Sequence, residues 1–329
     1  MTRTGWRLPA VTAAWCAAYA ALHVLWAVRG APRFGGNPGE SFLPEGWAAV
    51  APAVLGTVAA GLLLASPAAD GRRWAAVAAV AGWLGGTWLL LYAFMFPISV
   101  LTVLGGLFGQ AVTADDVAVL AARAGGAAAG TLTVLVAVMA GRRARGACPR
   151  CGRLPGRRPA RRTDPTPRWA YAAGLATVAA CLARLAAGVP EGTVSRVDPG
   201  TSGTFLSIFM VGMVLAGTLL PLALVHRWGR IWPGWVVPLA GRPVPRWLVL
   251  GPAFFLGAGM VGYFGVGGTY AWASGLVPGG AFLAVTLSAY TLWGVGLLVS
   301  AAGYLRLTRP PCPDEGSGRL SVPAGMMAA

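Results

Sequence analysis

Long apolar runs of about 20 residues recur along this chain of 329 residues, and they limit what it can fold into. As a helix, a run of that length crosses a hydrocarbon core of roughly 30 Å. Helices are expected because the backbone in lipid must satisfy its own hydrogen bonds, whereas barrel strands would be shorter and alternating. Only 11% of the residues are charged, against roughly 25% in soluble domains. The sequence therefore predicts an all-α, polytopic membrane helix bundle.

The apolar runs predict eight transmembrane helices, four on each side of a basic segment at 141–168. That segment holds ten arginines and a single acid, Asp164. Residues 98–112 are apolar but short and glycine-rich, which favours an interfacial or re-entrant piece over a further span. The predicted spans are 8–28, 47–65, 74–96, 113–140, 169–187, 204–225, 247–267 and 281–305.

The two groups of helices carry short matching sequences. Gly30-Ala31-Pro32 matches Gly188-Val189-Pro190, and Arg73-Trp74 matches Arg246-Trp247. Because each group has an even number of spans, the matches predict two parallel four-helix repeats, related by an axis along the membrane normal. The resulting units are 1–140, the first four-helix half; 141–168, a basic cytoplasmic linker; 169–305, the second four-helix half; and 306–329, a tail whose Pro/Gly/Ser composition predicts disorder.

Arginine supplies all 26 of the strongly basic residues, and its distribution predicts the orientation. Twenty-one arginines fall in alternate segments outside the spans, the termini included, and the preference for basic residues inside makes those segments cytoplasmic. Both termini are then expected on the cytoplasmic side of a bacterial inner membrane. This topology explains the net charge of +16, so we expect anionic lipid as the partner of the linker and no nucleic acid.

Arg184 is a charged residue inside a predicted span. Its helix, 169–187, runs from inside to outside, and helical side chains lean toward the N-terminus of their helix. Arg184 therefore leans toward the bilayer centre, where a charge costs about 2.5–3.5 kcal/mol on insertion scales unless it is paired or hydrated. Two explanations fit: an extended side chain that bonds outer-loop carbonyls, or an inward-facing contact to an anion or headgroup.

His23 lies near the outer end of the first predicted span, with Tyr19 one turn before it and Trp26 nearly one turn after it. The Gly-x-Pro match aligns Trp26 with Arg184. One interpretation of His23 is a hydrogen-bonded packing residue. The other is an outer-leaflet cavity that it lines together with Arg184 and the carboxylates of the outer loops. The candidate ligand-binding residues are Arg184, His23, Trp26, Glu40, Glu45 and Glu191.

Arg123 is the second arginine inside a predicted span, the helix at 113–140, which runs from outside to inside. Thr113 is a suitable N-cap for this helix, and Asp115 and Asp116 in its first turn complement the helix dipole. Arg123 leans outward toward Asp116, which lies two turns earlier on the same face. We therefore predict a structural ion pair between Arg123 and Asp116, reached by snorkelling.

Cys148 and Cys151 form a Cys-Pro-Arg-Cys sequence in the linker that resembles half of a zinc knuckle. Tetrahedral zinc needs four ligands, and the chain has no second Cys-x-x-Cys. Cys312 and His226 are the other candidates on the cytoplasmic side, but no recognised spacing joins them to this pair. No cofactor is predicted, and zinc at Cys148 and Cys151 is the alternative left open.

Two stretches resemble known families. His226–Trp247, HRWGRIWPGWVVPLAGRPVPRW, resembles a group of uncharacterised multi-pass membrane proteins of high-GC, actinobacterial-type bacteria. Tyr19–Gly36, YAALHVLWAVRGAPRFGG, is similar to the start of a small four-helix membrane family of unknown function. Neither resemblance implies an activity.

The chain lacks the motifs of common enzyme classes: it has no lysine for a Walker motif, no HExxH and no GxSxG. The architecture favours a non-enzymatic membrane protein that binds or transports a small amphipathic molecule between its two halves. An intramembrane enzyme acting on a lipid or isoprenoid is the first alternative. A membrane scaffold with a lipid-binding basic loop is the second.

Overall fold

The computed structural model describes residues 6–30, 47–65, 71–109, 111–148, 152, 161–188 and 201–309; for 201–209 and Ala48 it describes the backbone alone. Within these residues the structure is all-helical apart from turns and one isolated bridge between Ile231 and Pro243. Six helical stretches of the described chain are long and apolar enough to cross a membrane, as expected of a multi-pass membrane protein. They are Arg7–Arg29, Gly71–Phe108, Ala114–Ala144, Arg168–Gly188, Arg246–Ala273 and Ala281–Leu307.

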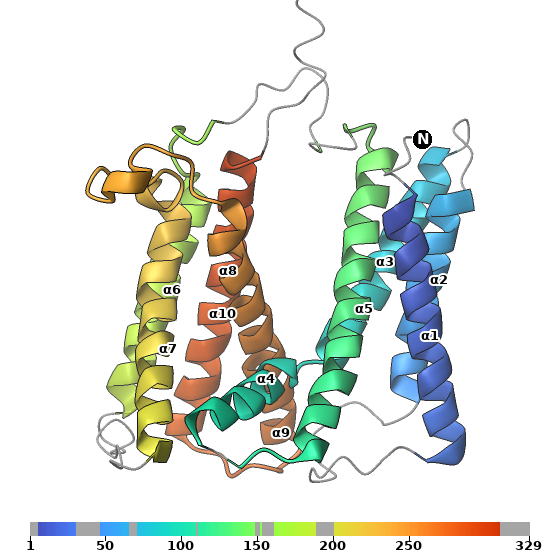
Figure 1. The fold of residues 1–329 in the computed structure, drawn as a ribbon, viewed down its shortest axis with the longest axis horizontal. Helices are drawn as coiled ribbons and strands as arrows, with labels where there is room; N and C mark the ends of the chain where they lie inside the picture. The colour runs from blue at the N-terminus through green and yellow to red at the C-terminus, as the bar shows by residue number, and fades with distance from the viewer. Residues whose placement is uncertain are drawn as a thin grey trace, which may run out of the picture.

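The first bundle lies on the right of Figure 1 and consists of α1 (Arg7–Arg29), α2 (Trp47–Ala65), α3 (Gly71–Tyr92) and α5 (Ala114–Ala144). α2 packs against the other three helices, and α5 also contacts α1 and α3. α1 ends at Gly30, whose φ of 89° is a conformation that favours glycine. α5 begins with the predicted cap, because Thr113 and Asp116 form a reciprocal capping box.

Glycines bring α3 and α5 into direct backbone contact. A Cβ atom on Gly86 would lie 3.1 Å from the carbonyl oxygen of Gly130, and a Cβ on Gly130 would lie 3.0 Å from that of Gly86. Each position also meets the side chain one turn after the opposite glycine: Val134 at 2.8 Å from the Gly86 position, and Leu90 at 2.8 Å from the Gly130 position. The crossing therefore accepts small residues alone.

The second bundle lies on the left of Figure 1 and consists of α6 (Arg168–Gly188), α7 (Thr201–Val225), α8 (Arg246–Met260) and α10 (Ala281–Leu307). α10 packs against the other three helices and buries Trp293 and Tyr304 in the core. α8 continues as η4 (Val261–Gly268), which is a π-helix, and as α9 (Thr269–Ala273). A π-helix of this length is rare, and π-turns often accompany functional sites.

α8 and α10 cross on glycines in the same manner as α3 and α5. A Cβ on Gly257 would lie 3.1 Å from the carbonyl oxygen of Gly294, and a Cβ on Gly294 would lie 2.8 Å from that of Gly257. The side chains one turn further on are again in contact: Leu298 at 3.0 Å from the Gly257 position, and Val261 at 3.0 Å from the Gly294 position. Each bundle therefore contains one reciprocal glycine crossing between two of its helices.

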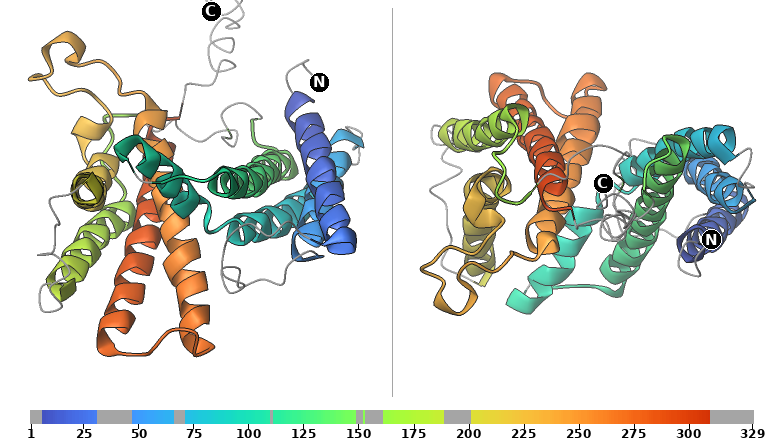
Figure 2. Two further views of the ribbon diagram at one scale, coloured as in Figure 1. Left: turned by 60° about the horizontal axis from the view of Figure 1, so that its bottom comes forward. Right: turned by 90° about the horizontal axis from the view of Figure 1, so that it is seen from above.

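α3 ends at Tyr92, short of the predicted residue 96, because the chain turns at 93–95 and starts a new helix. Pro97 stands in the first turn of that helix, α4 (Phe96–Gly105), where its missing N–H costs nothing. The 3₁₀ turn η1 (Gly106–Phe108) follows. The segment predicted as a non-spanning piece therefore holds a short helix, which lies between the two bundles in Figures 1 and 2.

The bundles meet at a joint where Phe94, which follows α3 of the first bundle, and Pro97 of α4 enter a glycine-lined surface of the second bundle. A Cβ on Gly262 would lie 3.1 Å from Cβ of Phe94, and a Cβ on Gly267 would lie 2.7 Å from the Phe94 ring. Pro97 stands equally close to Gly259, at 2.8 Å from the Cβ position of that glycine. The joint thus depends on glycines of α8 and η4.

Arginines close the ends of the bundles that are predicted to face the cytoplasm. α5 extends to Ala144, beyond the predicted end at 140, since basic residues stabilise the last turn of a helix. Arg143 Nη1 donates a hydrogen bond of 3.0 Å to the carbonyl of Leu63 at the end of α2. This contact ties together two helices of the first bundle.

A cap formed by residues 161–166 and 226–245 covers the corresponding end of the second bundle; it includes η2 (Arg227–Gly229) and η3 (Val237–Leu239). Arg162 Nη1 donates to the carbonyls of Arg230 and Val244, at 3.1 and 3.0 Å. Arg230 is 3% exposed and donates to the carbonyl of Asp164 at 2.8 Å, while its burial lowers the pKa of its guanidinium. These bonds fix the end of the linker to the second bundle.

Candidate functional site

α6 places Arg184 on the side that faces α10. The residue lies one turn beyond Cys181, which is buried in the core of the second bundle. Its guanidinium carbon stands 5.1 Å from the ring centroid of Phe282 and 5.4 Å from that of Tyr290. Such cation–π contacts contribute about 0.5 kcal/mol when exposed and about 2 kcal/mol when desolvated. Two aromatic faces of α10 therefore hold the charge inside the bundle.

Two further polar groups follow the same face of α10. Thr286 lies one turn from each of the two rings that flank Arg184, and Trp293 lies one turn beyond Tyr290. Arg184 Nε, Thr286 Oγ1 and Trp293 Nε1 are all buried, and none has a hydrogen-bond partner in the described part of the chain. A buried polar group left without a partner costs about 1–3 kcal/mol. We call Arg184, Thr286 and Trp293 the donor stripe.

The hydroxyl of Thr286 differs from those of other threonines in this bundle. Thr177, Thr218 and Thr291 each donate to the carbonyl one turn earlier, at 2.9, 2.7 and 2.6 Å. This bond is the usual way in which a helix satisfies a threonine in an apolar setting. Because Thr286 does not form it, its hydroxyl remains available to another group.

None of the three carboxylates that the structure describes belongs to α6 or α10. Asp115 and Asp116 lie in the first turn of α5 in the first bundle, and Asp164 precedes α6 at the end opposite to Arg184. The acids that the sequence offered as partners of Arg184, namely Glu40, Glu45 and Glu191, lie outside the described residues. Within the described chain, the donor stripe is therefore not neutralised by an acid.

An aromatic ladder leads from the donor stripe to the joint. Tyr290 stacks on Phe264 with ring centroids 4.1 Å apart, and Phe264 meets Tyr263 edge-on at 4.8 Å. Tyr263 stacks in turn on Phe94 of the first bundle at 6.1 Å. Both middle rings belong to the π-helix η4, so the irregular segment connects the surroundings of Arg184 with the contact between the bundles.

His23 is buried in the first bundle, where three aromatic rings surround it. Its ring centroid lies 4.4 Å from that of Tyr19, 4.9 Å from that of Trp26 and 5.7 Å from that of Tyr92. Its Nε2 has no hydrogen-bond partner among the described residues. The residue therefore packs as one ring within an aromatic cluster.

His23 and Trp26 lie in α1 of the first bundle and Arg184 lies in α6 of the second, so the described residues do not form the shared cavity that was one of the two interpretations of His23. α1 packs on α2 and α5, whereas α6 packs on α7 and α10. The two helices lie at opposite ends of the molecule in Figures 1 and 2. The physical reason is that each half buries its own helices, and the sequence match between Trp26 and Arg184 relates equivalent positions rather than neighbours.

Arg123 and Asp116 have contacts other than the predicted ion pair. Arg123 Nη1 donates to the hydroxyl of Ser99 in α4 at 2.6 Å. Asp116 Oδ2 accepts from the amide and the hydroxyl of Thr113, at 2.9 and 2.7 Å. The capping box thus takes up the carboxylate, while α4 brings Ser99 within reach of the arginine.

Cys148 is partly buried, and Cys151 lies outside the described residues. The carbonyl of Cys148 accepts a hydrogen bond of 2.8 Å from the amide of Gly152. In the part of the chain that the structure describes, no three His, Cys, Asp or Glu side chains gather closely enough to hold a metal ion. The described residues thus supply no complete zinc site.

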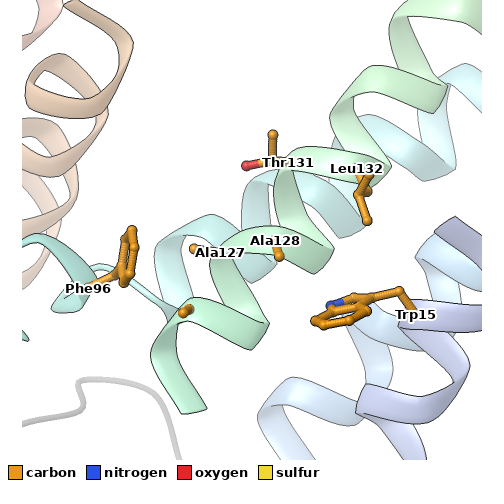
Figure 3. Close-up of a pocket in the computed structure, with 7 residues that line it drawn as sticks. Trp15, Phe96, Ala127, Ala128, Thr131 and Leu132 are labelled. Carbon is orange, nitrogen blue, oxygen red and sulfur yellow. The ribbon is translucent and has the colours of Figure 1, made fainter. Parts of the chain in front are cut away.

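An open hollow of about 490 Å³ lies on α5 between Trp15 of α1 and Phe96 of α4 (Figure 3). The indole of Trp15 donates to the carbonyl of Gly125 at 3.1 Å, so its polar atom is already engaged. Such a surface offers little to orient a polar ligand and suits a lipid chain. Its lining is otherwise almost wholly apolar: Ala124, Ala127, Ala128, Thr131 and Leu132.

The sequence predictions missed Phe282, Thr286, Tyr290 and Trp293. A signal for them exists in the spacing, because these residues recur at intervals of three or four and so share one face of a helix. The spacing does not show that this face meets Arg184, which is a property of the packing of α6 on α10.

No model of a known protein family, no curated protein and no solved structure matches this chain. A functional assignment therefore depends on the geometry of its own residues.

Proposed function

We propose that this chain is a bacterial cytoplasmic-membrane protein with eight spans and both termini inside. α2 has 19 residues and α7 has 25, lengths of about 28 Å and about 37 Å that suffice to cross a bilayer. The start of α1, the end of α5, the cap and the end of α10 lie at the same edge in Figure 1. That arrangement supports a cytoplasmic side that carries the arginines.

The two bundles are proposed to be parallel repeats. The same pairs of helices touch in each: the α1–α2, α2–α3, α3–α5, α1–α5 and α2–α5 contacts correspond to those of α6–α7, α7–α8, α8–α10, α6–α10 and α7–α10. The reciprocal glycine crossing supports this correspondence, since it joins α3 to α5 and α8 to α10. In the second bundle the crossing glycine Gly257 lies closer in sequence to Arg246-Trp247 than Gly86 of the first bundle lies to Arg73-Trp74. The proposed repeats therefore differ in register.

The proposed function is to bind a small amphipathic molecule in the membrane and move it by a change at the joint between the halves. One observation carries this proposal: Arg184 is charged, lies within the second bundle, and has a buried Nε without a partner in the described chain. Ionisable residues inside membrane helices are rare and mark ligand or ion pathways. The aromatic ladder supports coupling, because a ligand at Arg184 would also contact rings that reach the joint.

The intramembrane enzyme is disfavoured by the separation of its proposed groups. An enzyme that used His23 as an acid or base beside Arg184 would need both in one site, and these residues belong to different bundles. A general base must come within about 3 Å of the proton that it removes, directly or through one water. Binding needs the donor stripe alone, so it makes the smaller demand on the described residues.

The scaffold with a lipid-binding basic loop is kept as a second proposal because of the cap. Trp235 and Val237 of the cap are each 81% exposed, although both are apolar. Arg227 and Arg242 flank them and are exposed as well. Tryptophan beside arginine is typical of segments that lie in an anionic headgroup region. This surface can hold lipid whether or not the second bundle binds a ligand.

The test uses the full-length protein in nanodiscs of phosphatidylcholine, with radiolabelled single-chain lipids as probes. Arg184→Leu should weaken binding about tenfold or more, because a charged hydrogen-bond partner is lost. Arg123→Leu is the matched control, since Arg123 bonds Ser99 in the first bundle and should leave binding unchanged. If no single-chain lipid of any charge binds, or if both variants bind like the unmodified protein, the proposed function is wrong.

A further inference from the structure

We infer that the ligand of the donor stripe is an anionic amphiphile. Its acid group bonds Arg184 and Thr286, and a second, uncharged acceptor of the ligand, further from the acid group, bonds Trp293. This inference rests on the proposed function, because it names the chemical class of the molecule bound at the same residues.

The first step is the kind of polar atom left without a partner. Arg184 Nε–H and Trp293 Nε1–H can only donate hydrogen bonds. The Thr286 hydroxyl can donate as well as accept. Three donors require acceptor oxygens. An ammonium group supplies none and is repelled by the guanidinium. The groups therefore select a molecule that presents several oxygens along one side.

The second step is charge. Arginine stays protonated at any physiological pH, so the stripe carries a full positive charge inside an apolar bundle. The rings of Phe282 and Tyr290 offset part of this charge, and no described carboxylate belongs to α6 or α10. A carboxylate or phosphate complements it, and charge-assisted hydrogen bonds to such groups are roughly twice as strong as neutral ones. The acid group is assigned to the level of Arg184 and Thr286.

The third step is spacing. Trp293 lies two turns along α10 from Thr286, which corresponds to about 10 Å at 1.5 Å per residue. One acid group is too small to bridge that distance. The indole of Trp293, 2% exposed and without an acceptor among the described residues, therefore faces a different part of the ligand. An ester carbonyl placed between an acid headgroup and an acyl chain has the required position.

The test compares four radiolabelled probes with the same oleyl or oleoyl chain, on the full-length protein in phosphatidylcholine nanodiscs. Lysophosphatidic acid has both the acid and the ester, oleyl phosphate has the acid alone, and monooleoylglycerol has the ester alone. Lysophosphatidylcholine has the acid and the ester of lysophosphatidic acid and also carries a choline cation on the phosphate. We expect lysophosphatidic acid to bind at least about tenfold more tightly than each of the other three, since each lacks or masks one partner.

Variants assign the two acceptors to residues. Thr286→Val should weaken both phosphates, whereas Thr291→Val should not, because the Thr291 hydroxyl is already bonded to Leu287. Trp293→Phe should remove the advantage of lysophosphatidic acid over oleyl phosphate, while the exposed Trp247→Phe keeps it. Should Trp293→Phe fail to fold, the ratio of these two probes on the unmodified protein still decides the point.

The inference is overturned if monooleoylglycerol or lysophosphatidylcholine binds as tightly as lysophosphatidic acid and Arg184→Leu abolishes that binding. In that case the proposed function stands and the ligand class is different. Equal affinity for oleyl phosphate and lysophosphatidic acid overturns the assignment of Trp293. Binding of none of the four probes contradicts the proposed function itself, so the two failures are distinguishable.

Discussion

His23 in the first bundle and Arg184 in the second occupy comparable surroundings, and they differ in what those surroundings leave unsatisfied. Each lies in the first helix of its bundle and packs against aromatic rings. An imidazole can be buried neutral, so three rings complete its packing, and Nε2 has no hydrogen-bond partner among the described residues. A guanidinium cannot lose its charge, and within the described chain its Nε and two neighbouring donors on α10 have no hydrogen-bond partner.

This difference assigns separate roles to halves that share one helix-packing pattern. The described core of the first bundle consists of side chains from its own helices. The second keeps three buried polar groups that have no partner among the described residues, and these are the groups that the proposed ligand would satisfy. Under the proposed function, a ligand bound in the second bundle would shift the joint against the first. The following predictions test whether the two bundles are equivalent in packing and different in function.

The largest effects are expected at the two glycine crossings. Gly130→Val and Gly294→Val should each lower the free energy of unfolding by about 3 kcal/mol, since the new side chain meets a facing backbone in either bundle. Thermal unfolding in detergent measures the change. Gly61→Val and Gly251→Val are the matched controls, because nothing lies within 4 Å of either Cβ position. If only one crossing is sensitive, the bundles are not packed alike.

A smaller effect is expected at the arginine-closed ends of the bundles, which are predicted to face the cytoplasm. Arg162→Leu removes two bonds to carbonyls of the cap and should cost about 2 kcal/mol of stability, since charged hydrogen bonds are involved but the side chain is only half-buried. Arg143→Leu removes one bond, to Leu63, and should cost about 1 kcal/mol. Thermal unfolding in detergent compares the two variants. A larger loss of stability for Arg143→Leu than for Arg162→Leu would contradict this prediction.

The cap also predicts a modest effect on lipid association. Changing Trp235 and Val237 together to serine should weaken contact of the cap with anionic vesicles by about 1–3 kcal/mol, because two exposed apolar side chains are lost. Quenching of a fluorophore on the cap by brominated anionic lipid in nanodiscs reports the contact. The stability of the bundle should not change. Unaltered quenching would show that these two side chains do not hold the cap against anionic lipid.

Parts of this architecture were predictable from the sequence, because apolar length and cap chemistry act locally. The runs along the chain predict the helices, and Thr113 with Asp116 predicts the start of α5. The end of α3 was placed too late, since the turn at 93–95 depends on the packing of Phe94 at the joint. The separation of His23 from Arg184 was beyond sequence reasoning, because a repeat match relates positions and not distances.

The same limit applies to the donor stripe. Thr286 and Trp293 are ordinary residues of an apolar helix when read along the chain. Their importance follows from two facts of three-dimensional packing. α6 brings Arg184 over α10, and the hydroxyl of Thr286 does not bond the preceding turn as that of Thr291 does. Which buried groups lack partners is therefore known only once the helices are placed.

The smallest effect is expected at His23, and it separates the bundles most directly. His23→Phe keeps a ring among Tyr19, Trp26 and Tyr92 but removes the nitrogen that has no partner in the described chain. Because an unsatisfied buried group costs about 1–3 kcal/mol and the ring contacts remain, stability should rise by up to about 1 kcal/mol. Binding of lysophosphatidic acid should stay within about twofold of the unmodified protein, since a change in free energy below about 0.4 kcal/mol has no larger effect.

The other histidine of the chain is the control for this substitution. His226 Nδ1 lies 3.0 Å from the carbonyl of Leu222, and since a carbonyl only accepts, this nitrogen donates. His226→Phe therefore loses a bond that His23→Phe does not, and it should lower stability by about 1 kcal/mol. The two substitutions thus change stability in opposite directions if His23 is a packing residue. A His23→Phe protein that is less stable and no longer binds lysophosphatidic acid would place both bundles in one site, and the division of roles between them would fail.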